Sequence, residues 1–509
     1  MTGKVWLVGA GPSGAGLLTL RAKRVIEQAD VIVYDALIGQ DIVDIIPKTA
    51  EKIYAGKRAG RHTMPQEEMN RLLLSLARQG KRTVRLKGGD PFLFGRGGEE
   101  LELLREHQIP FEVVPGVSSA TAVPAYFGIP VTHRGLASCV HIITGHQKRD
   151  ESLQINYQAL KEAGGTLLFF MGIMNLHHIV GGLLEAGMDA ETPAAILQRG
   201  GGSGQKKICG TLGTLEEQAE GQKILTPAII AVGEVVKLGE KFAWFEKLPL
   251  FGKKFIVTRP RERARELVEK LCELGGGVLE LPTIAMEGIH PNAALRTALA
   301  HPKEYRFVVF TSPAGVAEFM EELFDMGKDV RYLGGVSIAA IGSGTAKMLR
   351  QYGIRADLVP EVYSGKALGE LLVRNCEAGD RVLFARSDIG NPELALDLQR
   401  NGIAVTDISV YITHQVREQF QEDGETEKKY AVEDADGVFF TSASTVRGFV
   451  SGFPGMDFSK VQALCIGEMT AEEAKKHGMQ VRTAGEATVE GLVELALAEK
   501  EEHERSGWR

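Results

Sequence analysis

The sequence has few cysteines, and their arrangement does not suggest a metal site. The five cysteines, at positions 139, 209, 272, 376 and 465, lie far apart, and none belongs to a C-x-x-C pair or a Cys/His cluster. We therefore expect no structural zinc or iron–sulfur site and no other metal. An odd number of scattered cysteines fits a reducing compartment, so a cytoplasmic protein is expected.

Long apolar runs and a strong excess of one charge are also missing. No stretch approaches the ~20 apolar residues that span a bilayer, and the start, MTGKVWLVGAG, lacks the features of a signal peptide. Lys and Arg number 59 against 66 for Asp and Glu, a formal net charge of −7. We therefore expect neither nucleic acid nor a membrane as a partner. With 44% hydrophobic and 25% charged residues, the composition is that of a globular protein.

Glycine, in contrast, is abundant. It makes up 60 of 509 residues, about 12% against a typical ~7%. Such an excess is typical of turns in which the backbone approaches a ligand or another segment closely. At roughly 150 residues per domain, the length predicts about three domains.

The two halves of the chain differ in pattern. The first 250 residues alternate β-rich runs with helical stretches, which is typical of α/β layers, and a boundary is expected at 248–254, LPLFGKK. The second half contains a repeat: FTSPAGV (310–316) and IGSGTA (341–346) return as FTSASTV (440–446) and IGEMTA (466–471). Two similar α/β lobes around a ligand-binding cleft are therefore expected there. Expected strands are 4–8, 31–34, 83–86, 140–144, 166–170 and 255–258, with a helix at 65–79.

The segment VGAGPSG matches a dinucleotide-binding fingerprint. Gly9, Gly11 and Gly14 satisfy G-x-G-x-x-G after an expected strand, and Asp35 ends the next one. An FAD- or NAD-dependent oxidoreductase is therefore one hypothesis. Two features weaken it: the following segment, LLTLRAKR (17–24), is bulky where a Rossmann helix favours small residues, and no second flavin or nicotinamide signature follows.

Several longer motifs resemble those of uroporphyrinogen-III C-methyltransferase, a tetrapyrrole methylase. They are ADVIVYDALI (29–38), VRLKGGDPFLFGRGGEE (84–100), PFEVVPGVSSATAVPAYFGIPVTHRG (110–135), TLLFFMG (166–172) and TPAIIAVGEVV (226–236), and the resemblance covers about residues 3–245. It implies two α/β lobes with S-adenosylmethionine (SAM) between them and a homodimer formed through this half. The implied reaction transfers two methyl groups to uroporphyrinogen III and gives precorrin-2, on the route to sirohaem or cobalamin.

The resemblance also assigns roles to residues. The family's proton acceptor matches Asp35 and its proton donor matches Lys57. Such groups suit the chemistry, because methyl transfer needs two ligands held in line and a base and an acid for proton movement. Arg58, Arg96 and Arg134 are candidates to bind the carboxylates of the substrate. The implied SAM contacts, with Ala228 as a further candidate, are Pro12, Gly88, Gly89, Asp90, Leu93, Ser118, Ser119, Met171 and Gly200.

Some of these residues also have a plain structural interpretation. Asp35 suits a turn at the end of a strand, Lys57 a surface position, and Met171 a buried strand. The turn Pro12-Ser13-Gly14 departs from the usual GPGD of the family. Because serine adopts a positive φ less readily than glycine does, the geometry of this loop is expected to differ slightly.

Residues 253–498 resemble uroporphyrinogen-III synthase more weakly, through VTRP (257–260), VPEVYSGKAL (359–368), VLFARSDIG (382–390) and the repeated motifs. The resemblance implies two lobes interleaved in sequence, about 255–284 with 412–498 and about 287–409, followed by a charged tail at 499–509. The implied reaction closes hydroxymethylbilane to uroporphyrinogen III with inversion of the last ring. The product of this half would then be the substrate of the other half.

The second half offers few conspicuous catalytic groups. Tyr363 matches a family tyrosine proposed to help the substrate hydroxyl leave. Ser312, Ser343 and Ser442 head expected helices, where backbone N–H groups would attract carboxylates or where the serines would serve only as N-caps. A half that binds the tetrapyrrole without catalysis is therefore an alternative.

Overall fold

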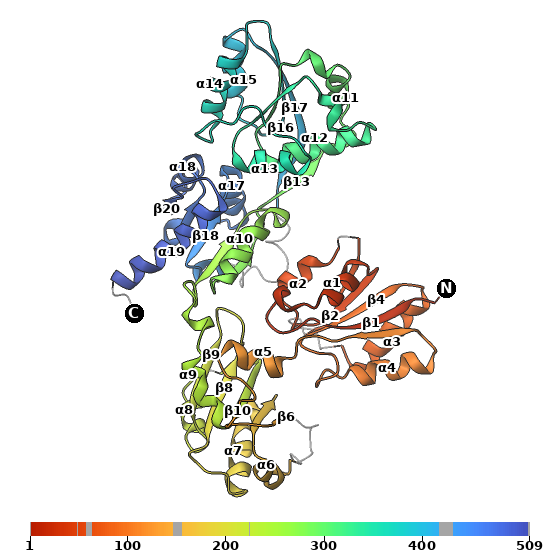
Figure 1. Cartoon of the computed structure of the whole chain (residues 1–509), viewed down its shortest axis with the longest axis vertical. Coiled ribbons are helices and arrows are strands. Elements are labelled where there is room, and N and C mark those ends of the chain that lie inside the picture. The colour runs from red at the N-terminus through yellow and green to blue at the C-terminus, as the bar shows by residue number, and fades with distance from the viewer. Residues whose placement is uncertain are drawn as a thin grey trace. The chain divides into compact units, whose positions relative to one another are not determined.

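The computed structural model describes residues 2–47, 49–56, 64–145, 155–222, 224–416 and 431–506, without the side chains of 261, 262 and 499–506. The chain divides into two compact units, Met1–Gly252 and Lys253–Arg509 (Figure 1). Each unit contains two five-stranded sheets. None of the helices within these ranges combines the length and the apolar character that crossing a membrane requires.

The first sheet of the first unit is entirely parallel. Helices α1 (Leu20–Glu27) and α2 (Gln40–Ile45) pack on one face, and α3 (Gln66–Arg78) and α4 (Gly97–Glu106) pack on the other (Figure 1). Because parallel strands end at the same edge of a sheet, the loops after β1, β4 and β5 start close together. Across the sheet, the strands are β3 (Glu51–Tyr54), β2 (Val31–Tyr34), β4 (Arg82–Lys87), β1 (Lys4–Gly9) and β5 (Phe111–Val114).

The second sheet of this unit is mixed. Helix α5 (Ser119–Tyr126) and the turn η3 (Glu234–Lys237) pack on one face, and α6 (Tyr157–Ala163), α7 (Leu176–Glu185) and α8 (Leu215–Ala219) pack on the other. The short helices η1 (Ala15–Leu17), η2 (Ile173–Asn175), α9 (Leu238–Lys241) and η4 (Phe245–Lys247) lie in connections. Across the sheet, the strands are β6 (Val140–Thr144), β7 (Thr166–Phe170), β10 (Ala228–Val232), β8 (Pro193–Gln198) and β9 (Lys206–Thr211).

The expected elements of the first unit agree with the structure to within one residue at each end. Helix α3 begins at Gln66, follows Pro65 and ends before Gly80, which has a φ of +81°. Thr63, the first residue of the expected capping box, lies outside the described residues. Glycine favours this end because it adopts a positive φ without strain.

The second unit contains a parallel sheet built from both ends of its sequence. Helices α17 (Ala443–Gly452) and α18 (Glu468–Lys476) share a core with it, and α10 (Arg261–Glu273) contacts α19 (Val489–Ser506). A short helix, η8 (Phe458–Lys460), precedes β19. Helix α19 runs into the segment that we expected to be a tail. Across the sheet, the strands are β12 (Gly277–Glu280), β11 (Lys254–Val257), β18 (Gly437–Phe440), β19 (Gln462–Cys465) and β20 (Gln480–Thr483).

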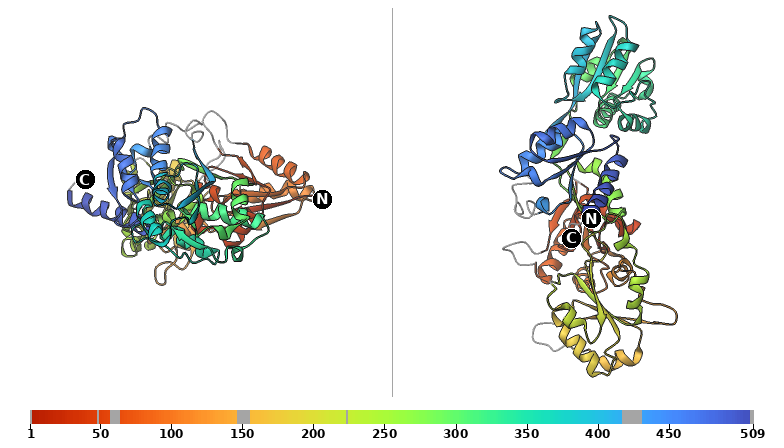
Figure 2. Two further views of the ribbon diagram at one scale, coloured as in Figure 1. Left: turned by 90° about the horizontal axis from the view of Figure 1, so that it is seen from above. Right: turned by 90° about the vertical axis from the view of Figure 1, so that its left-hand side faces the viewer.

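The middle of the second unit forms the other sheet, which is parallel except for β13. Helices α11 (Ala293–Leu299), α12 (Pro313–Asp325) and α13 (Ser343–Gln351) pack on one face, and α14 (Gly365–Asn375) and α15 (Glu393–Arg400) on the other (Figures 1 and 2). Turns η5 (Pro302–Glu304) and η6 (Val330–Leu333) precede β14 and β15. Across the sheet, the strands are β13 (Ile284–Gly288), β17 (Ala404–Gln415), β16 (Arg381–Ser387), β14 (Phe307–Phe310) and β15 (Ser337–Ala340).

The two sheets of the second unit are interleaved in sequence. The chain passes from the first sheet to the second at residues 281–283, and β17 continues to Gln415, where it pairs with Ile284 of β13. The second sheet therefore extends a few residues beyond the range of about 287–409 given above. The repeated motifs lie at β14–α12 and β15–α13 in one sheet and at β18–α17 and β19–α18 in the other.

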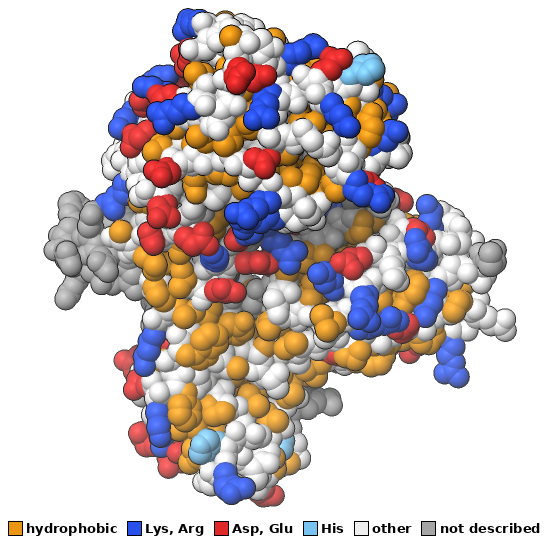
Figure 3. All heavy atoms as spheres, turned by 45° about the horizontal axis from the view of Figure 1, so that its top comes forward, with side chains coloured by type: hydrophobic (Ala, Val, Ile, Leu, Met, Phe, Trp, Pro, Cys, Tyr) orange, Lys and Arg blue, Asp and Glu red, His pale blue; other side chains and the backbone are white. Residues whose placement is uncertain are grey.

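On the face of the molecule shown in Figure 3, acidic and basic side chains lie interspersed. This mixture agrees with the small net charge of −7.

Candidate functional site

Two loops at the carboxyl edge of the first sheet are joined through their backbones. Gly11 N donates to Gly89 O at 3.1 Å, and Gly89 N donates to Gly11 O at 3.0 Å. Gly89 has a φ of +67°, and a Cβ placed on it would lie 3.9 Å from the nearest atom, Ser119 Oγ. An added Cβ would therefore meet only ordinary van der Waals contacts, so there is space beside the α-carbon for a group that approaches the backbone closely.

Asp90 connects this loop to the loop after β5. Its Oδ1 accepts a hydrogen bond from Phe92 N at 2.8 Å, and its Oδ2 accepts one from Gly116 N at 3.1 Å. Ser118 caps α5 by accepting from Ala120 N at 3.1 Å. Asp90 and Ser118 thus fix the backbone on both sides of Gly89, in addition to any contact that they make with a ligand.

The second sheet of the unit contributes further loops. Ser13 Oγ donates to Gly200 O at 2.5 Å, and Ser13 has a φ of +69°. The serine in the variant turn therefore adopts the left-handed conformation and uses its hydroxyl to hold the loop after β8. Ala228 pairs with Gln198, two residues before Gly200.

Leu93 and Met171 complete the set of residues expected to bind SAM. Leu93 packs against the core formed by α5 and the second sheet, and the ring of its neighbour Phe94 lies 5.5 Å from that of Phe170. Met171 follows Phe170, has a φ of +54° and is half exposed. It is thus not the buried strand residue of the alternative interpretation. The residues expected to bind SAM therefore fall into two groups. One group lies in the loop that contains Gly89 and in the loops joined to it, and the other lies at the neighbouring ends of β7, β8 and β10.

Asp35 lies at the end of β2, beside this group of loops. Its Oδ1 accepts from Leu37 N at 3.1 Å, and its Oδ2 accepts from Arg85 Nη2 at 3.2 Å. Leu37 is largely exposed, and its Cβ would lie 3.0 Å from a Cβ placed on Gly88. The proposed proton acceptor is therefore next to the glycine loop. Lys57, the expected proton donor, lies outside the described residues.

Of the three arginines expected to bind the substrate, the structure describes two. Arg58 lies outside the described residues. Arg96 precedes α4 with a φ of +55°, and its Nε and Nη2 donate to Glu99 at 2.9 and 2.6 Å. Arg134 is exposed in a turn closed by the bridge between His133 and Ala137. Among the described residues, no recorded contact joins Arg96 or Arg134 to Asp35 or Gly89.

In the second unit, three of the four expected residues lie at the carboxyl edge of the second sheet. Ser312 caps α12 by accepting from Gly315 N at 3.0 Å, and its Oγ lies 3.0 Å from Tyr411 Oη. Ser343 is the exposed first residue of α13. The ring of Tyr363 packs on Gly342, where a Cβ would lie 2.9 Å from it. These residues follow β14 and β15 and are brought to one place by the parallel strands.

Ser442 lies in the other sheet of the second unit. It heads α17 in a capping box, since its Oγ accepts from Thr445 N at 3.3 Å while Ser442 N donates to Thr445 Oγ1 at 3.3 Å. Its described contacts are with its own helix. The structure therefore shows the N-cap role for Ser442 and does not join it to Ser312.

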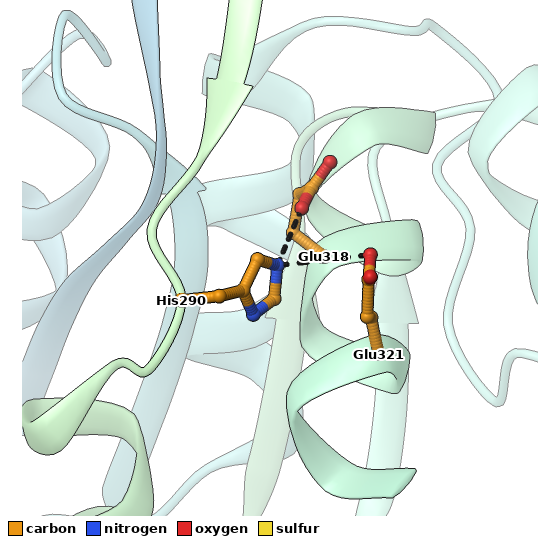
Figure 4. A group of neighbouring side chains, drawn as sticks. All are labelled: His290, Glu318 and Glu321. Carbon is orange, nitrogen blue, oxygen red and sulfur yellow. Dashed lines mark hydrogen bonds and ion pairs between the residues drawn. The ribbon is translucent and has the colours of Figure 1, made fainter. Parts of the chain in front are cut away.

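His290, which follows β13, lies against glutamates of α12, and Figure 4 shows it with Glu318 and Glu321. His290 Nε2 lies 2.7 Å from Glu318 and 3.7 Å from Glu321, and its Nδ1 lies 2.9 Å from the buried Glu322. Burial disfavours the charged ring, but the hydrogen bonds that the ring donates to Glu318 and Glu322, together with the nearby negative charges, outweigh burial and raise the pKa of His290. The described contacts of His290 are all with carboxylates, so we interpret the cluster as an ion-pair network.

Comparison with known proteins identifies both units. The family model for tetrapyrrole (corrin/porphyrin) methylases matches residues 4–216, and that for uroporphyrinogen-III synthase HemD matches 265–494. The "porphyrin biosynthesis protein HemD" of Ruminiclostridium josui is 43% identical over 495 residues, which cover 97% of this chain and 98% of that protein. The chain belongs to this HemD family. It is an enzyme with a methylase unit and a synthase unit, and the oxidoreductase hypothesis finds no support.

Other relatives match the methylase unit alone. The siroheme synthase of Nitrosomonas eutropha is 48% identical over 243 residues, 48% of this chain and 51% of that protein. The chain thus matches about half the length of this relative. A crystal structure of uroporphyrin-III C-methyltransferase from Thermus thermophilus, complexed with S-adenyl homocysteine, is 37% identical and covers 46% of this chain and 100% of that one, with a TM-score of 0.40.

The sequence did not reveal two of the side-chain contacts at the candidate sites of this HemD-family chain. Arg85 of the methylase unit binds Asp35, although it lies inside a buried strand. Tyr411 of the synthase unit meets Ser312 across 99 positions of sequence. The contact of Arg85 could have been suspected from VRLK, where Arg85 and Lys87 occupy alternate positions of an apolar strand. Such charged residues are rarely buried unless they are paired. No local pattern indicated the second.

Proposed function

We propose that the two units catalyse successive steps. The synthase unit, within residues 255–498, closes hydroxymethylbilane to uroporphyrinogen III with inversion of the last ring. The methylase unit, within residues 1–247, then transfers two methyl groups from SAM to give precorrin-2, on the route to sirohaem or cobalamin. Residues 248–254 link the two. The presence of both family matches on one chain supports this order, because the product of one unit is the substrate of the other.

The open space beside Gly89 carries the proposal for the methylase unit. A positive φ, a backbone pairing with Gly11 and the absence of a Cβ allow a ligand to lie against this turn. We propose that SAM binds here, with contacts from Asp90, Ser119, Met171 and the other residues assigned above. SAM supplies an electrophilic methyl group, and the chain supplies alignment of that group with a carbon of the tetrapyrrole.

Apolar and acid–base groups beside this space fit the tetrapyrrole. Leu37 and Phe92 are 66% and 60% exposed, and they offer an apolar surface for a macrocycle. Asp35 would accept a proton from the substrate, with Lys57 as the proton donor, and Arg58, Arg96 and Arg134 would bind its carboxylates. The proposal includes a homodimer formed through this unit, as the resemblance implies.

In the synthase unit, the proposal rests on groups that hold the substrate. Ser312, Ser343 and Tyr363 lie at the edge where β14 and β15 end. The starts of α12 and α13 would bind the side-chain carboxylates of hydroxymethylbilane, and the partly exposed Tyr363 would assist departure of the hydroxyl. Ser442 would add the start of α17. Such a site directs a reactive substrate mainly by restricting its conformation.

Each step has its own test. With uroporphyrinogen III and SAM, we expect a dimethylated product, and the Asp35→Asn variant should still bind S-adenosylhomocysteine but form this product much more slowly. With hydroxymethylbilane and no SAM, we expect isomer III. Formation of isomer I alone would support a unit that binds without catalysis. Tight binding of a flavin or NAD without affinity for S-adenosylhomocysteine would contradict the methylase proposal.

A further inference from the structure

Four ionisable side chains of the methylase unit form a connected row that ends at Asp35. Arg85 and Lys87 are alternate residues of β4, so they project from the same face of the sheet. Glu100 of α4 reaches both: its Oε1 accepts from Lys87 Nζ at 2.7 Å and from Arg85 Nε at 3.4 Å. Arg85 Nη2 then donates to Asp35 Oδ2 at 3.2 Å.

The row is buried except at the Asp35 end. The side chains of Arg85, Lys87 and Glu100 are 7%, 8% and 0% exposed, against 27% for Asp35. Two cations and two anions balance in charge, which is the condition under which buried ions are tolerated. Burial, followed by repulsion from Arg85, lowers the pKa of Lys87, and Glu100 acts in the opposite direction.

The guanidinium of Arg85 is fixed on three sides. Nε donates to Glu100, Nη1 donates to Leu86 O at 2.9 Å, and Nη2 donates to Asp35. The other oxygen of Asp35 accepts from Leu37 N. Each oxygen of the Asp35 carboxylate therefore has its own donor, and one of these donors is itself anchored in the interior.

We propose that Arg85 is a positioning residue, which orients the Asp35 carboxylate, and that Glu100 and Lys87 hold Arg85 in place. The inference rests on the proposed function, in which Asp35 accepts a proton. Arg85 itself exchanges no proton and does not touch the methyl donor. Because a guanidinium presents its donors in a rigid fork, it fixes the direction of the carboxylate that it binds.

The first test compares two arginines of β4. For Arg85→Gln we expect kcat for methylation to fall on the order of 10²-fold, as for a misplaced catalytic group, with an unchanged Kd for S-adenosylhomocysteine. Arg85→Lys should recover part of the rate.

Arg82→Gln is the matched control. Arg82 pairs with Asp30 at the amino end of the same two strands, where Nη2 lies 2.7 Å from Oδ1, but its side chain is 55% exposed. We expect this variant to methylate at the unaltered rate. An Arg85→Gln variant that behaves like this control would overturn the inference.

A double-mutant cycle with Asp35→Asn separates positioning from general damage. If Arg85 acts through Asp35, Arg85→Gln lowers single-turnover methylation in the unaltered background but hardly changes the residual rate of Asp35→Asn. An equal fold-loss in both backgrounds would show a merely structural role and would overturn the inference.

A further variant covers the case in which Arg85→Gln does not fold. Arg85→Gln with Glu100→Gln removes one charge of each sign and preserves the balance, so we expect a folded unit that binds S-adenosylhomocysteine and still methylates slowly. An unaltered rate in this variant would contradict the positioning role. Absence of methylation by the unaltered chain would overturn the proposed function and this inference together, whereas normal variants of an active chain would overturn the inference alone.

Discussion

At Ser13, in the turn after β1, backbone strain and a side-chain hydrogen bond have opposite effects on stability, and substitutions can separate them. Its φ of +69° is unfavourable for a residue with a Cβ, by about 1–2 kcal/mol relative to glycine. Its hydroxyl donates to Gly200 O and joins two of the loops that we propose to bind SAM. A hydrogen bond of this kind contributes about 1 kcal/mol, so the two terms are similar in size and opposite in sign.

Alanine and glycine at position 13 change the backbone strain and the hydrogen bond differently. Ser13→Ala keeps the backbone strain and loses the hydrogen bond, so the Kd for S-adenosylhomocysteine should rise by up to about fivefold. Ser13→Gly loses the hydrogen bond but removes the strain, and it should bind within about twofold of the unaltered chain. Titration calorimetry measures both values.

The control is Ser203→Ala, in the loop after β8, because Ser203 makes none of the described side-chain hydrogen bonds. We expect its affinity to be unchanged. Equal losses in the alanine and glycine variants would show that strain at position 13 is irrelevant. Unaltered binding by Ser13→Ala would refute the view that this hydrogen bond holds the two loops together for the ligand.

Three further predictions follow from the structure. Gly89→Val should abolish binding of S-adenosylhomocysteine in calorimetry, because a β-branched residue does not tolerate a φ of +67°. The control Gly98→Ala, in α4, should bind normally, because no atom lies within 4 Å of the added Cβ. Thermal unfolding of the synthase unit should occur at lower temperature as the pH rises from about 6.5 through the raised pKa of His290, because the charged ring stabilises the fold only below that pKa. His290→Gln should remove this pH dependence of the unfolding temperature, and an unchanged dependence in that variant would contradict the prediction. Tyr411→Phe should lower the proportion of isomer III in a product assay by freeing Ser312 Oγ, and an unchanged proportion would show that this contact does not shape the site.

The motifs of the sequence predicted much of the fold because they mark local structure. The repeat predicted two similar lobes in the second half, since FTSPAGV and FTSASTV each place a serine at the start of a helix after a buried strand. The N-terminal glycine pattern was misleading on its own, because G-x-G-x-x-G specifies a tight turn after a strand and not the ligand that binds there. Longer motifs resolved this ambiguity.

What the sequence did not predict depends on contacts between distant segments. Arg85 was not recognised as the partner of Asp35, because alternation in a strand suggests that a charged residue faces solvent. In the structure α4 covers this face of the sheet, and its Glu100 binds Arg85. The exposure of Met171 follows from its positive φ at the end of β7, which a run of apolar residues does not reveal. The cluster around His290 also requires α12 to lie beside the chain after β13.

A single incubation tests the central claim most directly. The unaltered chain is given hydroxymethylbilane and SAM together under anaerobic conditions, and the products are identified by mass and isomer. We predict that a dimethylated type III tetrapyrrole, precorrin-2, accumulates without any added enzyme. Recovery of unmethylated isomer I alone would contradict the assignment of both steps to this chain.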